Sequence, residues 1–316
     1  MIRPMAIINR DELKQALDGA QSILLTVHIH PDADAIGSMV AFYEALIQAG
    51  KKVTMVVDDV VPQKFSFMAH VDQIKTVAQM DDWSADMLLV LDASTKERIG
   101  QVGTVYAGPI YNVDHHISNS KFADGLYLMT NYAATGEIIA SCCQEWQWPI
   151  TKTMATSLYA AIASDCGFFR FSNTTEHTLT MAGLCVAQGA EPNVVSEHLE
   201  VTTKARLEVM KDAFSSISFH KENTVASIAL DKELMIRVGD DTDGFVDIIR
   251  NVDTVDISIF LKYVDEQTTR VSLRSKQSDV NEIASHFGGG GHIRASGCTI
   301  NAPITEALTK LLAVIK

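Results

Sequence analysis

The sequence predicts an α/β protein: an N-terminal domain with a mainly parallel sheet flanked by helices, a helical connector, and a smaller α+β C-terminal domain. Apolar runs at residues 22–27, 87–91 and 109–113 each end beside a histidine or aspartate and are separated by longer segments. This is the βαβ pattern of a parallel sheet whose strands are buried on both faces. After residue 220 the strand pattern becomes alternating. The length of 316 residues also suggests about two domains.

Helices and strands are expected to alternate through the first domain, residues 1–192. Residues 11–20 have the periodicity of a short amphipathic helix, and a buried strand at 22–27 follows it. Gly50 is a suitable stop for the next helix, at 35–49. The other expected elements are strands 52–57, 87–91 and 109–113 and helices 135–148, 153–163 and 175–188.

The segment 193–220 is helical in pattern, charged, and without a carboxylate cluster, so we interpret it as a connector. The C-terminal domain is assigned to residues 221–316. Its expected elements are strands 225–230, 255–263 and 269–274, a helix at 281–286, and a strand followed by a helix from residue 299 to the end. The run Phe287-Gly288-Gly289-Gly290-Gly291-His292 lies inside this domain and is expected to form a loop.

Composition excludes several classes of function. The chain has 26 Lys and Arg against 39 Asp and Glu, a net charge of −13, which argues against binding long duplex nucleic acid over a broad surface. Five cysteines without a C-x-x-C pair argue against a disulfide framework or a thiolate zinc site. No apolar run approaches the roughly 20 residues of a membrane span, and residues 1–10 do not resemble a secretory signal. We therefore expect a cytoplasmic protein without a membrane partner.

The central motif is His-Ile-His-Pro-Asp-Ala-Asp-Ala-Ile-Gly-Ser at residues 28–38. Its proline forbids a continuous helix, so His28 and Asp32 are not a helical i, i+4 pair. We expect a strand that ends at His28, a loop that carries Asp32 and Asp34, and a helix that begins near Ala35. In an open α/β sheet, such a junction between a strand end and a helix start is where ligands bind.

Further carboxylates and histidines lie at or near other strand and helix ends: Asp92, Asp114, His115, His116 and Asp165. Carboxylates gathered at one sheet edge would raise one another's pKa values and repel a phosphate, unless cations compensate them. Two divalent ions would leave such a site nearly neutral. Imidazole and carboxylate ligands without thiolate suit Mn²⁺ best, with Mg²⁺, Co²⁺ or Fe²⁺ as alternatives.

The three consecutive residues Asp114, His115 and His116 are not all expected to bind metal. Along an extended chain, Asp114 and His116 lie on one side and His115 on the other. One ligand, one orienting carboxylate and one substrate-facing imidazole is the simplest division of roles. Any single aspartate or histidine is more often a cap, a turn former or a surface residue, but the ordered set favours a metal site. Thr135 is interpreted as a helix N-cap, with a direct role of Thr135-Gly136-Glu137 in the site as the alternative.

These motifs, together with Asp165-Cys-Gly-Phe-Phe-Arg170 and the glycine run before His292, resemble the DHH phosphoesterase superfamily. They are similar to its branch with a C-terminal DHH-associated domain, and within it to the nanoRNase/pAp phosphatases. The resemblance implies that Asp114 orients its neighbours and that His116 faces the scissile phosphate. It also implies two Mn²⁺ sites that share one aspartate: His28, Asp32 and Asp92 for one ion, and Asp34, Asp92, His115 and Asp165 for the other.

The glycine run suggests how an acidic protein holds a nucleotide. Consecutive glycines let backbone N–H groups approach a phosphate or a base closely. We expect the substrate to be bound by Arg170, Arg274, Gly289, Gly290, Gly291 and His292. If the metals and this cradle hold opposite ends of the substrate, short substrates fit best.

The implied activity is hydrolysis of short single-stranded oligoribonucleotides (nanoRNA) to 5'-mononucleotides, and of pAp to AMP and phosphate. The resemblance implies in-line attack by a hydroxide that bridges the two ions. A phosphodiesterase for cyclic di-AMP or its linear product pApA is the enzymatic alternative. A non-catalytic nucleotide sensor is a third hypothesis, which the intact ligand set disfavours. Similar proteins are often homodimers, but the helix patterns do not test this.

Overall fold

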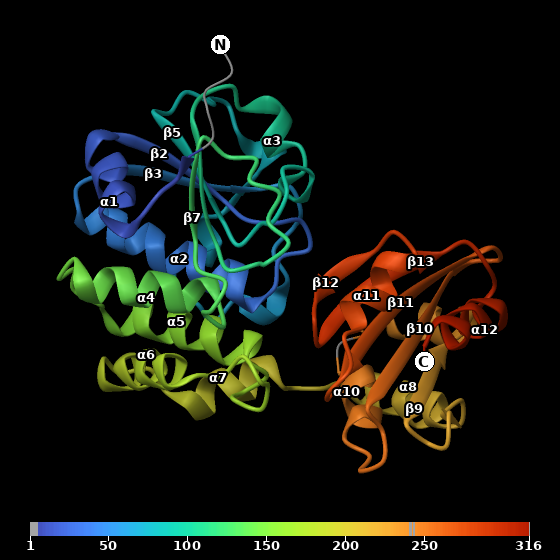
Figure 1. The fold of residues 1–316 in the computed structure, drawn as a ribbon. Helices are drawn as coiled ribbons and strands as arrows, with labels where there is room; N and C mark the ends of the chain where they lie inside the picture. The colour runs from blue at the N-terminus through green and yellow to red at the C-terminus, as the bar shows by residue number, and fades with distance from the viewer. Residues whose placement is uncertain (1–5, 240–241, 243, 316) are drawn as a thin grey trace. The chain divides into compact units, whose positions relative to one another are not determined.

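The computed structural model describes residues 6–239, 242 and 244–315, and it divides into two compact units between Val201 and Thr202. Unit 1 is built on a seven-stranded sheet and unit 2 on a six-stranded sheet (Figure 1). The predicted fold class, a parallel α/β domain followed by a smaller α+β domain, is confirmed. None of the helices in the described part of the chain has the length and apolar character that a bilayer crossing needs.

The sheet of unit 1 has the strand order β1-β7-β6-β5-β2-β3-β4, and each neighbouring pair is parallel. Its central strands consist almost entirely of buried aliphatic residues, as expected for strands covered on both faces. The strands are β1 (Ala6–Ile7), β2 (Ser22–Thr26), β3 (Lys52–Val57), β4 (Lys75–Thr76), β5 (Met87–Leu91), β6 (Ile110–Asp114) and β7 (Gly125–Leu128).

Both faces of this sheet are packed. On β5, Leu89 and Leu91 point into the larger core with the long helices, whereas Leu88 and Val90 point into a smaller core with η4 and α3. Figure 1 shows α4, α5 and α6 stacked beyond α2 on the side of the larger core. The helices of unit 1 are α1 (Arg10–Gly19), α2 (Ala33–Gln48), α3 (Val102–Val105), α4 (Thr135–Glu145), α5 (Lys152–Asp165), α6 (Glu176–Ala187) and α7 (Pro192–Leu199), with 3-10 turns η1 (Gln63–Phe65), η2 (Val71–Gln73), η3 (Val77–Gln79) and η4 (Glu97–Ile99).

A glycine allows α2 and α5 to pack against each other. A Cβ atom on Gly37 would overlap the carbonyl oxygen of Ser157 on α5. Gly37→Ala is therefore expected to lower the free energy of unfolding by about 1–3 kcal/mol, the usual cost of overpacking. Gly183→Ala on α6 is the matched control, because a Cβ atom there meets no atom within 4 Å. Helix propensity predicts a gain of about 0.5–1 kcal/mol for that control. Denaturant unfolding checks both values, and equal effects of the two changes would refute the packing argument.

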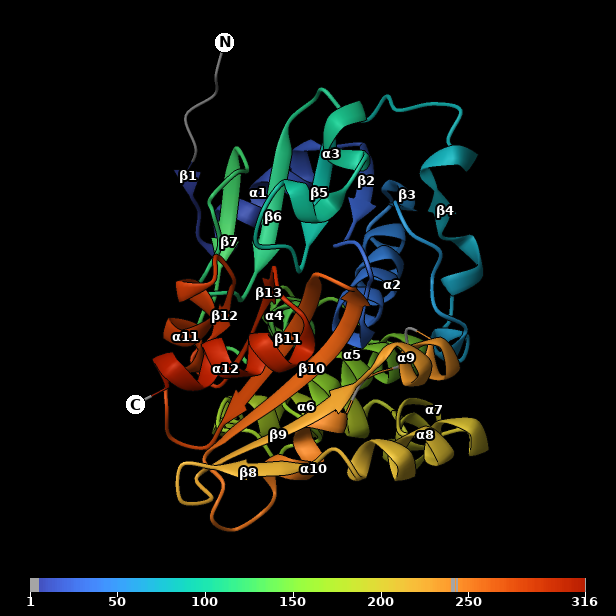
Figure 2. The same cartoon turned by 90° about the vertical axis from the view of Figure 1, so that its right-hand side faces the viewer.

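Unit 2 has a mixed sheet with the order β12-β13-β11-β10-β9-β8, in which only the β9–β10 pair among these strands is parallel. Figure 2 shows this sheet with α11 and α12 over one face, and hydrophobic contacts place α8 and α10 against the other. The elements are α8 (Lys204–Phe214), β8 (Ser218–His220), β9 (Val225–Leu230), α9 (Lys232–Val238), α10 (Phe245–Arg250), β10 (Ile257–Asp265), β11 (Thr268–Ser275), α11 (Val280–His286), β12 (Gly290–His292), β13 (Ala295–Ile300) and α12 (Ile304–Val314).

Several element boundaries differ from the prediction. Helix α2 begins at Ala33 with Asp32 as its N-cap, so Asp34 lies in the first helical turn and not in a loop. The N-cap of α4 is Ala134, so the prediction of Thr135 as the cap is wrong. Part of the glycine run, predicted as a loop, forms strand β12. The segment expected to be a connector, 193–220, is divided between the units: α7, which begins one residue before it, belongs to unit 1, whereas α8 and β8 belong to unit 2.

Candidate metal centre

The β2–α2 junction places His28 and Asp32 side by side. His28 follows β2, and its Nδ1 lies 2.8 Å from the carbonyl oxygen of Ile29, which leaves Nε2 to face the carboxylates. That Nε2 atom is 3.6 Å from Asp32 Oδ2 and 3.4 Å from Asp92 Oδ2. Asp32 caps α2 by accepting the N–H of Ala35 with Oδ1, and its side chain is 56% exposed. His28, Asp32 and Asp92 thus form a group of three possible metal ligands, of which only Asp32 is exposed.

Asp92 lies at the centre of the candidate site, directly after β5. Its φ angle of +56° is left-handed, a conformation that costs free energy in most residues but that aspartate tolerates. Its two oxygens face different neighbours. Oδ2 faces His28, whereas Oδ1 is 3.5 Å from His115 Nε2 and 3.7 Å from His116 Nδ1. Asp92 can therefore contribute to two adjacent groups of ligands.

At the end of β6, one buried carboxylate contacts both of the histidines that follow it. Asp114 Oδ1 accepts the backbone N–H of His115 at 2.9 Å and lies 2.7 Å from His116 Nδ1. Asp114 Oδ2 accepts the side-chain amide of Asn119 at 2.6 Å. Both oxygens of Asp114 are therefore used within the protein. These contacts fit a carboxylate that orients its neighbours and does not itself bind a cation.

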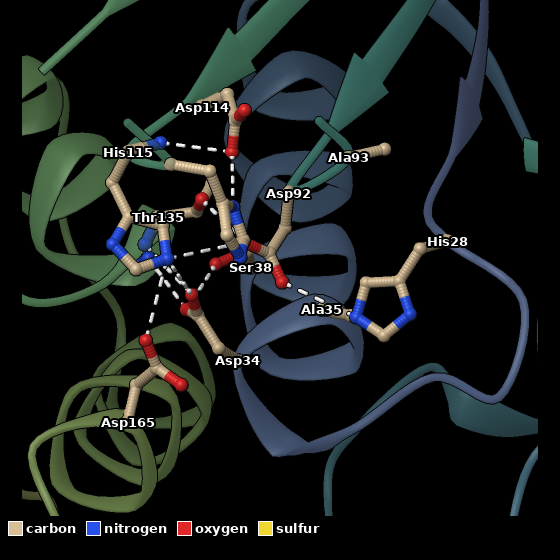
Figure 3. A network of polar contacts seen from close by, with 12 residues as sticks. His28, Asp34, Ala35, Ser38, Asp92, Ala93, Asp114, His115, Thr135 and Asp165 are labelled. Carbon is tan, nitrogen blue, oxygen red and sulfur yellow. Dashed lines mark hydrogen bonds and ion pairs between the residues drawn. The ribbon is translucent and has the colours of Figure 1, made fainter. Parts of the chain in front are cut away.

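His115 connects Asp92 to a second group of carboxylates. Its Nδ1 lies 3.3 Å from the carbonyl oxygen of Tyr132, which fixes the ring. Its Nε2 lies 3.3 Å from Asp165 Oδ2 and 3.9 Å from Asp34 Oδ2. Figure 3 shows Asp34, Asp92, His115 and Asp165 pointing toward one another, with Asp92 between that group and His28.

The structure thus brings together all six residues that were predicted as metal ligands. Among the described residues, the donor atoms of three sets lie within 4.8 Å of one another: His28, Asp32 and Asp92; Asp34, His115 and Asp165; and Asp92, His115 and His116. The third set adds His116 to the candidate donors. Donors of this kind, carboxylate and imidazole without thiolate, fit Mn²⁺, Mg²⁺ or Co²⁺.

Burial and mutual contact shift the pKa values of the carboxylates. Burial, with repulsion from Asp92 and Asp165, raises the pKa of Asp34 well above its usual range. Burial likewise raises the pKa of Asp165 to about 7, although the charge of His115 opposes the shift. For Asp92, burial acts to raise the pKa, but hydrogen bonds from His115 and His28 outweigh it and hold the pKa well below normal.

The pKa values of His28 and His115 are raised, which favours the protonated form of both imidazoles. Burial lowers the pKa of His28, but hydrogen bonds to Asp32 and Asp92 outweigh burial and raise the pKa to about 10. The pKa of His115 is also raised well above normal, because contacts with Asp92 and Asp165 outweigh its burial. Without bound metal, protons on these groups balance the buried carboxylates. Divalent cations would take over that role, so the residues present fit a metal site.

The contacts that Thr135, Gly136 and Ser38 make with Asp34 were not predicted from the sequence. Its Oδ2 accepts the backbone N–H of Thr135 at 2.7 Å, and its Oδ1 accepts that of Gly136 at 2.8 Å and the hydroxyl of Ser38 at 3.1 Å. Thr135 Oγ1 also donates to Asp92 Oδ1 at 3.0 Å. The affinity of helix N-termini for anions was the available signal, since Thr135 was predicted to begin a helix.

The predicted substrate residues are divided between the two units. In unit 1, Arg170 is 65% exposed, donates from Nε to the carbonyl oxygen of Gly167 at 2.7 Å, and has a terminal nitrogen 4.0 Å from Glu200 Oε1. In unit 2, Arg274 on β11 and His292 on β12 both lie opposite Ala295 on β13. Arg274 and His292 therefore lie on the same face of that sheet.

The glycines of unit 2 have a packing role of their own. Cβ atoms on Gly289 and Gly291 would collide with the backbone of β13, whereas a Cβ atom on Gly290 would meet Asn281 Oδ1 at 3.7 Å, an ordinary contact distance. The glycine run is thus explained in part by close approach between strands β12 and β13.

Comparison with known proteins finds one family match in each of the two units. Residues 22–162 match the DHH family, N-terminal domain, and residues 237–316 match the DHHA1 domain. The chain carries a DHH domain followed by a DHHA1 domain. The resemblance predicted from the sequence motifs is confirmed. The candidate metal centre of this DHH–DHHA1 protein is formed mainly within the DHH match, and Asp165 lies just beyond it.

Curated relatives match over nearly their full length. The bifunctional oligoribonuclease and PAP phosphatase of Thermus thermophilus is 28% identical over 311 residues, which cover 96% of this chain and 92% of the relative. The protein of the same name from Bacillus subtilis is 27% identical over 300 residues, covering 92% and 93%. Both relatives thus align with this chain over nearly its whole length.

Solved structures share the fold. An exopolyphosphatase-related protein from Bacteroides fragilis superposes with a TM-score of 0.87 at 24% identity, covering 96% of this chain and 94% of that one. RecJ from Thermus thermophilus in complex with Mn²⁺ has a TM-score of 0.53 at 10% identity, covering 98% and 55%. At these identities the likeness establishes the fold alone.

Proposed function

We propose that this DHH–DHHA1 protein is a metal-dependent phosphoesterase that hydrolyses short oligoribonucleotides to 5'-mononucleotides and pAp to AMP and phosphate. The observation that carries the proposal is the convergence of two donor groups on the opposite oxygens of Asp92. The names of the Thermus and Bacillus relatives support the choice of substrates. Short single-stranded RNA and small nucleotides are the proposed partners.

In this proposal, His28, Asp32 and Asp92 hold one cation, and Asp34, Asp92, His115 and Asp165 hold the other. Mn²⁺ is the proposed ion, with Mg²⁺ and Co²⁺ as alternatives. When bound, two such ions neutralise phosphate charge and lower the pKa of water, which favours hydrolysis of a phosphoester.

His116 is the proposed catalytic residue, and Asp114 positions it. The hydrogen bond between Asp114 Oδ1 and His116 Nδ1 fixes the ring and directs Nε2 away from the carboxylate. Burial lowers the pKa of His116, but this hydrogen bond and the charge of Asp92 outweigh burial and raise the pKa. The imidazole is 25% exposed, so a substrate can reach it. Protonated His116 would donate a proton toward the phosphate or the leaving oxygen.

The residues of unit 2 are proposed to bind the nucleotide. Arg274 and His292 lie on one sheet face, and the exposed Gly290 leaves backbone accessible beside His292. Gly289 and Gly291 would keep β12 close to β13 and so present that backbone. Arg170 of unit 1, with its exposed guanidinium, is the proposed contact for a further phosphate.

Turnover of a substrate series with and without metal tests this proposal. We expect pAp and di- or trinucleotides to be hydrolysed after addition of Mn²⁺, and activity to disappear with a chelator and return with added metal. A long RNA should be cleaved more slowly than a trinucleotide. Faster cleavage of the long RNA would refute the preference for short substrates, and preferred hydrolysis of pApA or cyclic di-AMP would favour the alternative phosphodiesterase.

A further inference from the structure

Residues 132–137, which we call the α4 entry segment, contact half of the candidate ligands. The carbonyl oxygen of Tyr132 lies 3.3 Å from His115 Nδ1. The N–H of Thr135 donates to Asp34 at 2.7 Å, and its hydroxyl donates to Asp92 at 3.0 Å. The orientation of these three ligands therefore depends on where this short segment lies.

One buried carboxylate anchors the α4 entry segment. Glu137 is 0% exposed, and its Oε2 accepts the N–H of Ala133 at 2.8 Å and the hydroxyl of Thr178 at 3.0 Å. Its Oε1 lies 2.6 Å from His177 Nδ1. A buried carboxylate costs free energy unless several donors satisfy it, and here three donors surround it. Glu137 thus ties the segment to the first turn of α6.

His177 and Asn173 add two further ties. The ring of His177 lies over that of Tyr132, with centroids 4.4 Å apart, and its side chain is 36% exposed. The side-chain amide of Asn173 donates to the carbonyl oxygens of Ala133 at 3.4 Å and Asp165 at 3.2 Å. The same segment is therefore linked to the end of α5 that carries Asp165.

We propose that Glu137 and His177 are positioning residues: they fix the α4 entry segment, which in turn aligns His115, Asp34 and Asp92 for the binding of a cation. This inference rests on the proposed function. The α4 entry segment contacts only one oxygen of Asp92. Thr135 bonds to Oδ1, the oxygen that faces His115, whereas Oδ2 faces His28. The effect should therefore concentrate on the ion held by Asp34, His115 and Asp165.

Unit 1 contains a matched control network. Glu44 on α2 accepts the hydroxyls of Thr151 at 2.6 Å and Thr153 at 2.8 Å, and lies 3.1 Å from His70 Nε2. It therefore has the same kinds of partner as Glu137, a histidine and threonine hydroxyl, but these partners lie outside the candidate metal centre. Glu44→Gln should reproduce any general loss of stability without the loss of alignment.

The experiment is a Mn²⁺ titration of the full chain, followed by electron paramagnetic resonance, with thermal unfolding measured in parallel. In Glu137→Gln, the amide cannot accept hydrogen bonds at both ends, so one donor loses its partner. We expect Glu137→Gln and His177→Ala to weaken one of two Mn²⁺ sites by about 10- to 100-fold, the usual effect of outer partners of metal ligands. Glu44→Gln should retain both affinities even if its melting temperature falls as far.

A second pair of variants covers the case in which Glu137→Gln does not fold. Thr135→Val removes the hydroxyl that bonds to Asp92, whereas Thr135→Ser keeps it. Weakened Mn²⁺ binding in the valine variant, restored in the serine variant, would support the inference. If the unaltered protein, Glu137→Gln and His177→Ala bind Mn²⁺ with equal affinity, the inference is overturned but the proposed function is not. A loss of Mn²⁺ affinity in Glu44→Gln as large as that in Glu137→Gln would have the same meaning. No Mn²⁺ binding by the unaltered protein would overturn the proposed function and the inference together.

Discussion

Asp92→Asn is expected to lower kcat/KM for pAp by at least about 10³-fold, because one change removes a charge that both donor groups share. Asparagine has one neutral amide oxygen where Asp92 presents two carboxylate oxygens, one toward His28 and one toward His115. It also tolerates the left-handed backbone at this position, so the fold should persist. Steady-state kinetics with saturating Mn²⁺ measures the loss.

Asp82→Asn serves as the control for this variant. Asp82 is an exposed aspartate whose hydrogen bonds are to Ser84, outside the candidate metal centre. We expect full activity in the control. Circular dichroism should show the same secondary structure in both variants. Near-normal turnover by Asp92→Asn would mean that the residue does not serve both groups.

Mn²⁺ affinity is expected to rise steeply with pH, by about tenfold or more per unit between roughly pH 6 and pH 8. The raised pKa values of His28 (about 10) and His115 mean that these imidazoles carry protons at neutral pH in the absence of metal. The raised pKa values of Asp34 and Asp165 act in the same direction. A ligand must lose its proton to bind metal, so acid competes with the cation and binding is lost as the pH falls.

Calorimetric titration in buffers of different ionisation enthalpy measures the protons released. We expect at least one proton for each ion bound, since each group of donors contains a histidine with a raised pKa. An affinity that does not change with pH, with no protons released, would show that the cluster binds no cation through these imidazoles.

The sequence was sufficient for the central elements of the fold. Strands β2 and β5 appeared as continuous apolar runs and β3 and β6 as mainly apolar ones, because strands covered on both faces need mostly apolar side chains. The short strands β1 and β4 were missed, since two residues give no periodicity. Strand β7 was also missed, because its four residues are defined by pairing with β6 and β1 and not by a local pattern.

The candidate ligands were predictable because parallel strands end at one edge, which brings Asp92 and Asp114 near the β2–α2 junction. The start of α2 was misplaced by two residues because the capping role of Asp32 was not weighed. The contacts of Thr135 join residues 101 and 43 positions apart in the chain, and Glu137 meets His177 across 40 positions. No local pattern carries such information.

The glycine run at residues 288–291 shows a second limit of prediction from sequence. Its composition suggested a ligand loop, but composition does not distinguish a glycine needed for a ligand from one needed for packing. Gly289 and Gly291 approach the backbone of β13, so strand packing alone requires them. In the described contacts, no close approach to β13 requires a glycine at position 290. A substitution of Gly290 is therefore the better test of nucleotide binding.

The central claim is that the carboxylate and imidazole cluster holds two divalent ions that share Asp92. Anomalous diffraction from crystals grown with Mn²⁺ tests it most directly. We expect two peaks, one on each side of the Asp92 carboxylate, one ligated by His28 and Asp32 and the other by Asp34, His115 and Asp165. Absence of peaks at this cluster, or a single ion that does not contact Asp92, would contradict the account.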